Sequence, residues 1–269
     1  MACLTPRNLP HHRCIRKELR ITPRAVCNER TDYFGNQLSF FTVQEPHNRL
    51  VVEARSEVAI DEHEKPRPEL SPAWEEVARS LPHDGKAASL EAYQFVFESP
   101  RIRPSAEFAA YAVQSFKPGR RFAEALLDLT ARIHKDFRFD SKATSVRTPP
   151  EEVLRKRCGV CQDFAHLQIA CLRSLSLPAR YVSGYLRTFP PPGRPRLIGA
   201  DVSHAWVSSY CPAIGWLDVD PTNNVVPSCN HVTLAWGRDY GDVSPLRGLI
   251  LGGRDHTLKV AVDVEPVEA

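Results

Sequence analysis

The chain has 269 residues, of which 35 are basic and 32 acidic, so its formal net charge is +3 with neutral histidines. This length allows one large domain or two modest ones. The near balance of charge, without a long run of one sign, does not indicate a phosphate-binding strip. With 42% hydrophobic and 25% charged residues, the composition excludes disorder, collagen and coiled coil. We expect an ordinary globular protein with no nucleic-acid partner.

No apolar stretch approaches the ~20 residues that span a bilayer, and the N-terminus lacks the apolar segment of a secretory signal. The sequence therefore predicts a cytoplasmic protein with no membrane partner. The eight cysteines are too few for a disulfide scaffold of this length, and a cytoplasm keeps thiols reduced. We expect free thiols, one of which carries the chemistry.

Short apolar runs between turns predict strands within residues 16–62, arranged as a small β-sandwich, and the prolines of 63–71 predict a linker. Three- and four-residue spacing of apolar side chains predicts a helix over 120–137 with one buried face. Residues 161–175 form a helix that is apolar around most of its circumference, so it is central. Further helices are expected at 72–80, 86–97, 105–116 and from Thr148–Pro150 to Arg157.

Strands are predicted after the central helix, with one loop rich in proline and glycine at 189–199. Because this loop lies between a core strand and the strand that carries His204, we expect it to overhang the cleft. The predicted strands cover residues 180–187, 202–210, 216–220, 232–236, 249–251 and 258–264.

The first chemical motif is GVCQDFAH at 159–166, which places Cys161 in the first turn of the central helix. Unpaired backbone N–H groups and the helix dipole favour an anion there, so they stabilise a thiolate and make the thiol nucleophilic. The same N–H groups could hold a developing oxyanion. The alternative is a small buried hydrophobic residue, which is what most lone cysteines are.

A second motif joins His204, inside one predicted strand, to Asp220 in the next. If the two strands form an antiparallel hairpin with Tyr210 opposite Trp216, Asp220 is a diagonal neighbour of His204 on the same face. A slip of one residue would send Asp220 to the opposite face. In this register Cys161, His204 and Asp220 match the nucleophile, base and orienting group of a catalytic triad.

Several neighbours could support the site or compete with it. Gln162 could donate to an oxyanion only if its side chain turns toward the cleft, and Asp163 is stabilised by the helix dipole whatever its function. Asp218 has the strand parity to replace Asp220 if the hairpin is longer. His166 is expected to be structural. Trp206 and Trp216 are expected to pack beside the site.

Cys158 and Cys161 form a C-x-x-C pair, which could be a redox pair or half of a zinc site. The other cysteines offer no second close pair for zinc, and no thioredoxin-like context surrounds the motif. We therefore expect neither a metal nor a cofactor.

These motifs resemble the bacterial transglutaminase-like family of the papain-like cysteine superfamily. The resemblance rests on GVCQDFAH, PARYVSGYL at 178–186, SHAWV at 203–207 and WLDVDPTN at 216–223. It extends to DYFGN at 32–36, PHNRLVVEARSEV at 46–58 and LAWGRDYGDVSP at 234–245. It implies an α+β fold in which a papain/transglutaminase-like core, a central helix on an antiparallel sheet, follows a small β-sandwich domain.

The resemblance also divides the chain into an N-terminal β-domain (1–65), a helical connection (66–118) and a catalytic core with C-terminal strands (119–269). Family members usually begin with an additional tyrosine-rich strand before Arg16. Here Met1–His12 does not alternate like a strand, so we expect the β-domain to be shortened or misassigned at its start, with an uncovered sheet edge.

The resemblance places the nucleophile on Cys161, the base on His204 and the third member on Asp220. It implies cleavage of amide or peptide bonds through a thioester, in a peptide or protein substrate. Two alternatives stay open: a protein-glutamine transglutaminase with an amine acceptor, and a non-catalytic binding protein on the same fold. The sequence leaves the oligomeric state undetermined.

Overall fold

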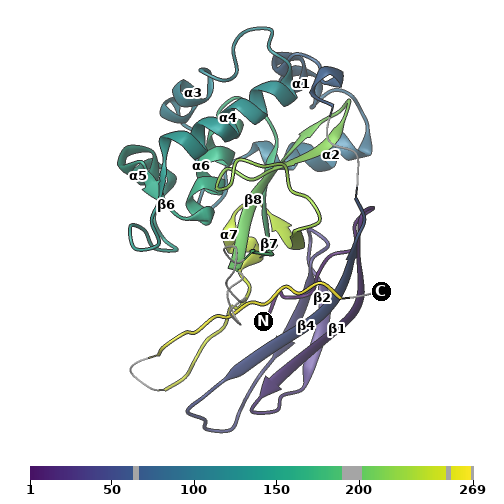
Figure 1. The fold of residues 1–269 in the computed structure, drawn as a ribbon, viewed down its shortest axis with the longest axis vertical. Helices are drawn as coiled ribbons and strands as arrows, with labels where there is room; N and C mark the ends of the chain where they lie inside the picture. The colour runs from purple at the N-terminus through teal and green to yellow at the C-terminus, as the bar shows by residue number, and fades with distance from the viewer. Residues whose placement is uncertain (63–66, 190–201, 253–255, 268–269) are drawn as a thin grey trace.

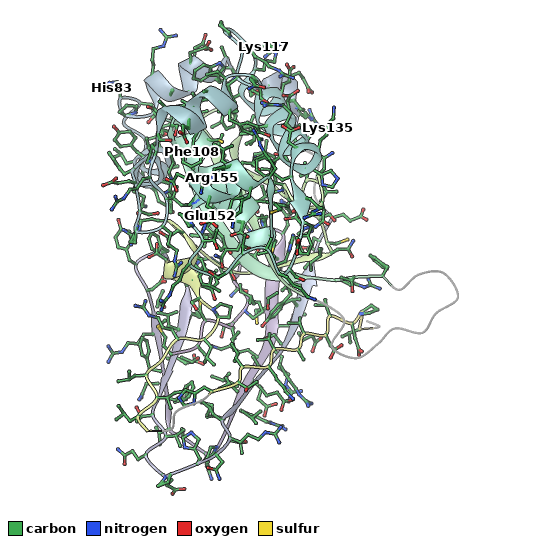
Figure 2. The ribbon with its side chains drawn as sticks, turned by 90° about the vertical axis from the view of Figure 1, so that its left-hand side faces the viewer. His83, Phe108, Lys117, Lys135, Glu152 and Arg155 are labelled. Atoms are coloured by element: carbon green, nitrogen blue, oxygen red, sulfur yellow. The ribbon has the colours of Figure 1, made fainter. Side chains whose placement is uncertain are left out.

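The computed structural model describes residues 1–62, 67–189, 202–252 and 256–267. The molecule is elongated, with its helices at one end and the N-terminal strands extending toward the other (Figure 1). Figure 2 shows the same division from the side, with Phe108, Glu152 and Arg155 in the helical end. The predicted linker falls partly on residues 63–66, which lie outside the described residues, and continues into a 3₁₀ turn, η1 (Pro68–Leu70).

The N-terminal strands form two antiparallel pairs. Strand β1 (His12–Thr22) pairs with β4 (Val51–Ile60), and β2 (Cys27–Thr31) pairs with β3 (Gln37–Phe41). The β-domain expected from the sequence is therefore present. Sequence analysis missed β2 because all of its side chains are exposed, which leaves no alternation of buried and exposed positions to recognise.

A stack of arginine and tryptophan side chains ties the N-terminal segment to the second half of the chain. The guanidinium of Arg7 lies 3.5 Å from the ring centroid of Trp236, and Arg180 lies 3.7 Å from the same ring. Arg180 also lies 3.8 Å from the ring of Trp216. Such cation–π contacts strengthen when they are shielded from water. Trp216 therefore packs on a buried arginine, and its ring also contacts Phe95 and Tyr210. That it packs beside the site stays a prediction.

The helices follow the predicted order. Val77, Phe108 and Ala112 of the 66–118 region belong to the same apolar core as the later helices, whereas Ala92 lies in a second cluster with Leu81 and Tyr210. Within the described residues, no helix is both long enough and apolar enough to cross a membrane. The helices are α1 (Trp74–Ser80), α2 (Ala87–Tyr93), α3 (Ala106–Ala112), α4 (Phe122–Asp136), α5 (Pro150–Lys156), α6 (Cys161–Arg173) and α7 (Tyr240–Val243), with a 3₁₀ turn η2 (Gln94–Val96) after α2.

Helix α6 is the centre of the fold. Every residue from Gln162 to Arg173 is buried, and the helix packs against α3, α4 and α5 as well as the sheet. This confirms the prediction of a central helix, since a helix that is apolar on most sides must be covered on most sides. Only its first residue, Cys161, is partly exposed.

The sheet beside α6 is antiparallel, with the strand order β10-β7-β8-β9. In it, Tyr210 pairs with Trp216 and Val207 pairs with Val219, so the hairpin register predicted from the sequence is confirmed. The strands are β7 (Ala179–Leu186), β8 (Val202–Cys211), β9 (Gly215–Val219) and β10 (His231–Gly237).

Two C-terminal strand predictions are wrong: residues 249–251 and 258–264 form no strand. Leu249, Leu251 and Leu258 are 85%, 87% and 76% exposed, so these apolar runs do not pack against a sheet face. A short apolar run predicts a strand only where a partner covers it. The predicted 189–199 loop lies, apart from its first residue, outside the described residues.

Gly184 allows the middle of the sheet to pack closely. A Cβ atom there would overlap the carbonyl oxygen of Val232 and lie 2.5 Å from Cη2 of Trp206. Replacing Gly184 with alanine is therefore expected to destabilise the protein by about 3 kcal/mol, because neither the backbone nor the buried indole can move freely. Urea denaturation measures this, with Gly248→Ala as the control, since no atom lies within 4 Å of that position. Equal effects of the two substitutions would contradict the prediction.

Candidate active site

Cys161 begins α6, directly after a short strand pair that fixes its position. Strand β6 (Cys158–Gly159) lies parallel to β5 (Arg138–Phe139), and Val160 is the extended N-cap residue of the helix. The first backbone N–H groups of a helix lack intrahelical partners and favour an anion, and Cys161 lies in this first turn. Cys158, the other cysteine of the C-x-x-C pair, belongs to the strand and not to the helix.

Asp163 closes the first turn of α6. Its Oδ2 accepts hydrogen bonds from the backbone N–H of Val160 at 2.8 Å and from the hydroxyl of Thr144 at 2.6 Å. Burial raises the pKa of Asp163, while these two hydrogen bonds oppose the shift. A Cβ atom on Gly159 would lie 2.7 Å from this carboxylate, so the glycine leaves room for it. Asp163 therefore fixes the helix start and ties the 140–148 segment to it.

The side chain of Gln162 is directed to that same segment. Its Nε2 donates to the carbonyl oxygen of Val146 at 3.2 Å, and the residue is buried. One N–H of this amide therefore has a backbone partner in the 140–148 segment.

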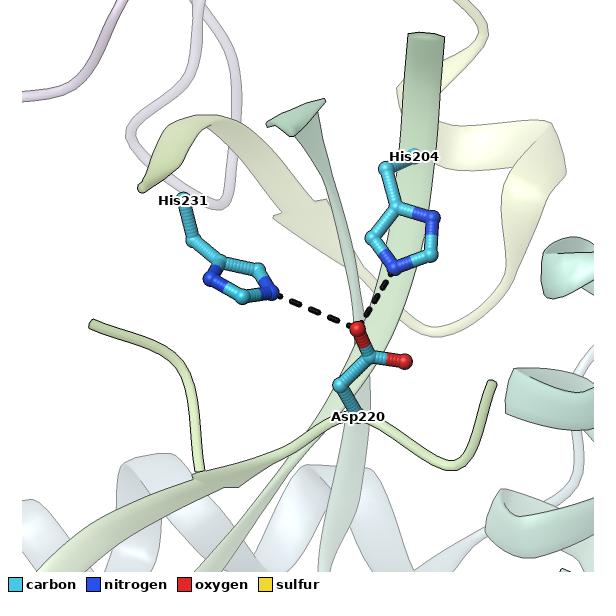
Figure 3. A group of neighbouring side chains, drawn as sticks. All are labelled: His204, Asp220 and His231. Carbon is cyan, nitrogen blue, oxygen red and sulfur yellow. Dashed lines mark hydrogen bonds and ion pairs between the residues drawn. The ribbon is translucent and has the colours of Figure 1, made fainter. Parts of the chain in front are cut away.

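His204 and Asp220 form a buried pair. His204 Nε2 lies 2.7 Å from Oδ2 of Asp220, and the two side chains are 3% and 0% exposed (Figure 3). Burial by itself lowers the pKa of His204. Hydrogen bonds with Asp220 and Cys161, together with their charges, outweigh burial and raise this pKa to about 9. The thiol of Cys161 is therefore among the groups that raise the pKa of His204.

The turn that follows β9 holds the carboxylate of Asp220. Its Oδ1 accepts the backbone N–H groups of Thr222 at 2.9 Å and Asn223 at 3.2 Å, and its Oδ2 accepts the Asn223 side-chain amide at 2.7 Å. Burial alone would raise the pKa of Asp220. The hydrogen bonds from His204, His231 and Asn223 and the charge of His204 hold it far below its ordinary value.

His231, the first residue of β10, is the second histidine on this carboxylate. Its Nε2 lies 3.3 Å from Oδ2 of Asp220 (Figure 3). The possible ligand atoms of His204, Asp220 and His231 lie within 4.8 Å of one another, close enough to share a metal ion, but both imidazoles contact Oδ2 of Asp220 at hydrogen-bond distances. Two imidazoles and a carboxylate suit zinc. The 2.7 Å contact of His204 is a hydrogen-bond length, and a metal would have to replace that proton.

The remaining predicted neighbours have other partners. Asp218 accepts a hydrogen bond from the indole of Trp206 at 3.0 Å, so its carboxylate is engaged away from His204. His166 is fully buried, and its Nε2 accepts the backbone N–H of Tyr240 at 3.1 Å. Burial lowers the pKa of His166 to about 3, so it is a neutral structural residue.

Sequence reasoning missed Asn223 and His231. The Asp-Pro-Thr-Asn stretch carries a turn signal that could have identified Asn223, because an aspartate often accepts backbone N–H groups two residues later. His231 has no such signal. It reaches the site because β10 lies beside β7, a pairing between strands far apart in the sequence.

The chain matches two family descriptions. Residues 107–221 match the transglutaminase-like superfamily, and residues 1–59 match the bacterial transglutaminase-like N-terminal region. The uncharacterized protein Rv2569c of Mycobacterium tuberculosis is 41% identical over 276 residues, covering 98% of this chain and 86% of that protein.

Two further relatives are more distant. A protein-glutamine gamma-glutamyltransferase of Pseudomonas aeruginosa is 35% identical over 97 residues, covering 35% of this chain and 14% of that protein. The crystal structure of a proposed cysteine protease from Cytophaga hutchinsonii superposes with a TM-score of 0.71 and 22% identity, covering 91% of this chain and 77% of that one. This likeness shows a shared fold. The chain belongs to the transglutaminase-like superfamily.

Proposed function

We propose that the protein is a cysteine-dependent acyl-transfer enzyme in which Cys161, His204 and Asp220 act as nucleophile, base and orienting residue. The observation that carries this proposal is the environment of His204, whose ring interacts with Asp220 on one side and with the thiol of Cys161. A nucleophile next to an imidazole that a carboxylate orients is the arrangement that activates thiols.

The first half-reaction transfers one proton and exchanges one bond. The thiol gives its proton to His204, the sulfur attacks an amide carbonyl, and the first-turn N–H groups of α6 stabilise the oxyanion. The carbon–nitrogen bond then breaks as His204 returns the proton to the departing amine. A thioester on Cys161 remains.

The second nucleophile determines the product. Water gives a peptidase or amidase, whereas an amine gives a transglutaminase. We favour water, because it attacks the thioester wherever it is not excluded. The relative named as a glutamyltransferase keeps the amine acceptor as the second candidate.

Selective alkylation tests the proposed thiol chemistry. Cys161 is expected to react with iodoacetamide at about pH 6.5 at least about tenfold faster than the exposed cysteines Cys27 and Cys229, because an imidazolium stabilises the thiolate. Mass spectrometry of peptides from one sample gives all three rates, so the exposed cysteines are internal controls. If Cys161 reacts no faster than they do, a non-catalytic binding protein on this fold is the better description.

A peptide library with a labelled amine separates the two acyl-transfer outcomes. New peptide termini or deamidated glutamines indicate hydrolysis, and amine adducts indicate transamidation.

We also place the protein in the cytoplasm, where a reducing environment suits its eight free cysteines.

A further inference from the structure

Asp220 has more hydrogen-bonding partners than a triad requires. Figure 3 shows His204 and His231 approaching the same carboxylate oxygen from two directions. The two contacts with Oδ2 are 2.7 Å from His204 and 3.3 Å from His231, and both imidazoles are buried. A triad uses one imidazole on its carboxylate, so the second buried imidazole needs an explanation of its own. Its burial is costly unless it is paired, and Asp220 is its partner.

The hydrogen bonds around His231 define its tautomer. Its Nδ1 accepts the backbone N–H of Ser228 at 3.4 Å, in a turn where the backbone N–H of His231 donates to the carbonyl of Ser228 at 2.9 Å. A nitrogen that accepts a hydrogen bond carries no proton, so the proton of a neutral His231 is on Nε2. That N–H faces Asp220.

Packing holds the ring of His231 in place. The indole of Trp206 meets it edge-on, with centroids 5.3 Å apart and an interplanar angle of 83°. The indole fits there because Gly184, on the strand between β8 and β10, has no side chain. The imidazole is therefore a fixed donor.

We propose that His231 is a positioning residue of the acyl-transfer reaction: its Nε2–H holds Oδ2 of Asp220 in place and keeps the carboxylate ionised opposite His204. The inference rests on the proposed function, since it concerns the same triad. A donor bonded to a carboxylate favours its charged form, whereas burial favours the neutral one. A protonated Asp220 would no longer stabilise the imidazolium of His204, and the thiolate of Cys161 would lose its partner.

The groups facing Asp220 come from several elements. His204 belongs to β8, His231 to β10 and Asn223 to the turn after β9. Helix α4 reaches the same turn, but not the carboxylate, through His134, whose Nδ1 lies 2.8 Å from the carbonyl oxygen of Thr222. Helix α6 contributes Cys161, which acts on His204. Among the contacts of Asp220 in the described part of the chain, the one with His231 can be removed without altering the triad or its turn.

The test is the pH dependence of Cys161 alkylation in the full chain, which requires no substrate. In His231→Leu the donor is lost, so Asp220 takes up a proton at higher pH. The pH at which labelling falls to half its rate is expected to rise by about one unit. In His231→Gln an amide N–H replaces the imidazole donor, and this midpoint is expected to stay within about 0.3 units of the original. Val232→Ala, a buried substitution in the same strand, is the packing control.

The outcomes separate the role of His231 from the proposed function of the enzyme. An unchanged midpoint in His231→Leu overturns the role of His231, as does an equal shift in His231→Gln or in Val232→Ala. The proposed function itself stands while Cys161 of the original protein labels faster than Cys27. If it does not, both proposals fail.

A measurement on the unaltered protein covers the case in which His231→Leu does not fold. Nitrogen-15 NMR, with the His231 signals assigned by their loss in His231→Gln, is expected to show that the neutral imidazole has its proton on Nε2 and none on Nδ1. A proton on Nδ1 instead would overturn the inference.

Discussion

Replacing Cys161 with alanine is expected to abolish turnover, with a loss of about 10⁵- to 10⁶-fold, because Cys161 is the thiol that interacts with His204 among the described residues. Product formation from the peptide library, followed by mass spectrometry, measures the loss. The melting temperature is expected to stay within a few degrees of the original, since Cys161 is partly exposed at the first position of α6.

Cys158→Ser is the matched control for this substitution. It removes a neighbouring thiol that lies in β6, outside the start of α6, and it is expected to leave turnover unchanged. If Cys161→Ala retained turnover while Cys158→Ser lost it, the nucleophile would have been assigned to the wrong cysteine.

Replacing Asp220 with asparagine is expected to reduce turnover by about 10³- to 10⁴-fold, less completely than the loss of the nucleophile. The backbone N–H groups of Thr222 and Asn223 require an acceptor at the Oδ1 position, so the oxygen of the new amide occupies it. Its NH₂ group then takes the place of Oδ2 and faces the Nε2 atoms of His204 and His231. To accept this donor, His204 must carry its proton on Nδ1, where it can no longer take a proton from the thiol.

The same substitution is expected to lower stability in a pH-dependent way. The raised pKa of His204 means that its ion pair with Asp220 stabilises the fold fully below about pH 6.5, and this contribution is lost as the pH rises through about 9. The pKa of Asp220 is lowered in the folded protein. The charge of Asp220 therefore stabilises the fold fully at pH values above the ordinary pKa of an aspartate, and this stabilisation is lost only in strong acid.

The difference in unfolding free energy between Asp220→Asn and the original protein is therefore expected to be largest from about pH 4 to 6.5 and to shrink toward pH 9 and above. Urea denaturation at several pH values measures it. Asp218→Asn is the control, because Asp218 bonds to Trp206 and is not expected to alter turnover strongly. A larger loss of turnover in Asp218→Asn would exchange the roles of the two aspartates.

The elements around the site could be predicted from the sequence because each has a local cause. The apolar side chains around most of the circumference of α6 predict a central helix, and α6 is buried from Gln162 onward. The hairpin register follows from strand alternation and a short turn, and the pairing of Tyr210 with Trp216 confirms it. These features depend on residues that are close together in the chain.

The failed predictions have an equally physical cause. The apolar residues of 249–251 and 258–264 read as strands, but most of their side chains are exposed, so burial did not select a sheet there. Strand β2 was missed for the opposite reason, since it pairs with β3 although its side chains are exposed. Local pattern reports which side chains are apolar, and only packing decides which of them are covered.

For this protein, the sequence by itself determined the thiol at the start of a buried helix and the hairpin that brings Asp220 toward His204. Only the tertiary structure placed His231 on that carboxylate, engaged Gln162 with Val146, and bonded Asp218 to Trp206. The physical reason is sequence separation. A helix face and a hairpin are set by neighbouring residues, whereas the second donor on Asp220 depends on where β10 joins the sheet.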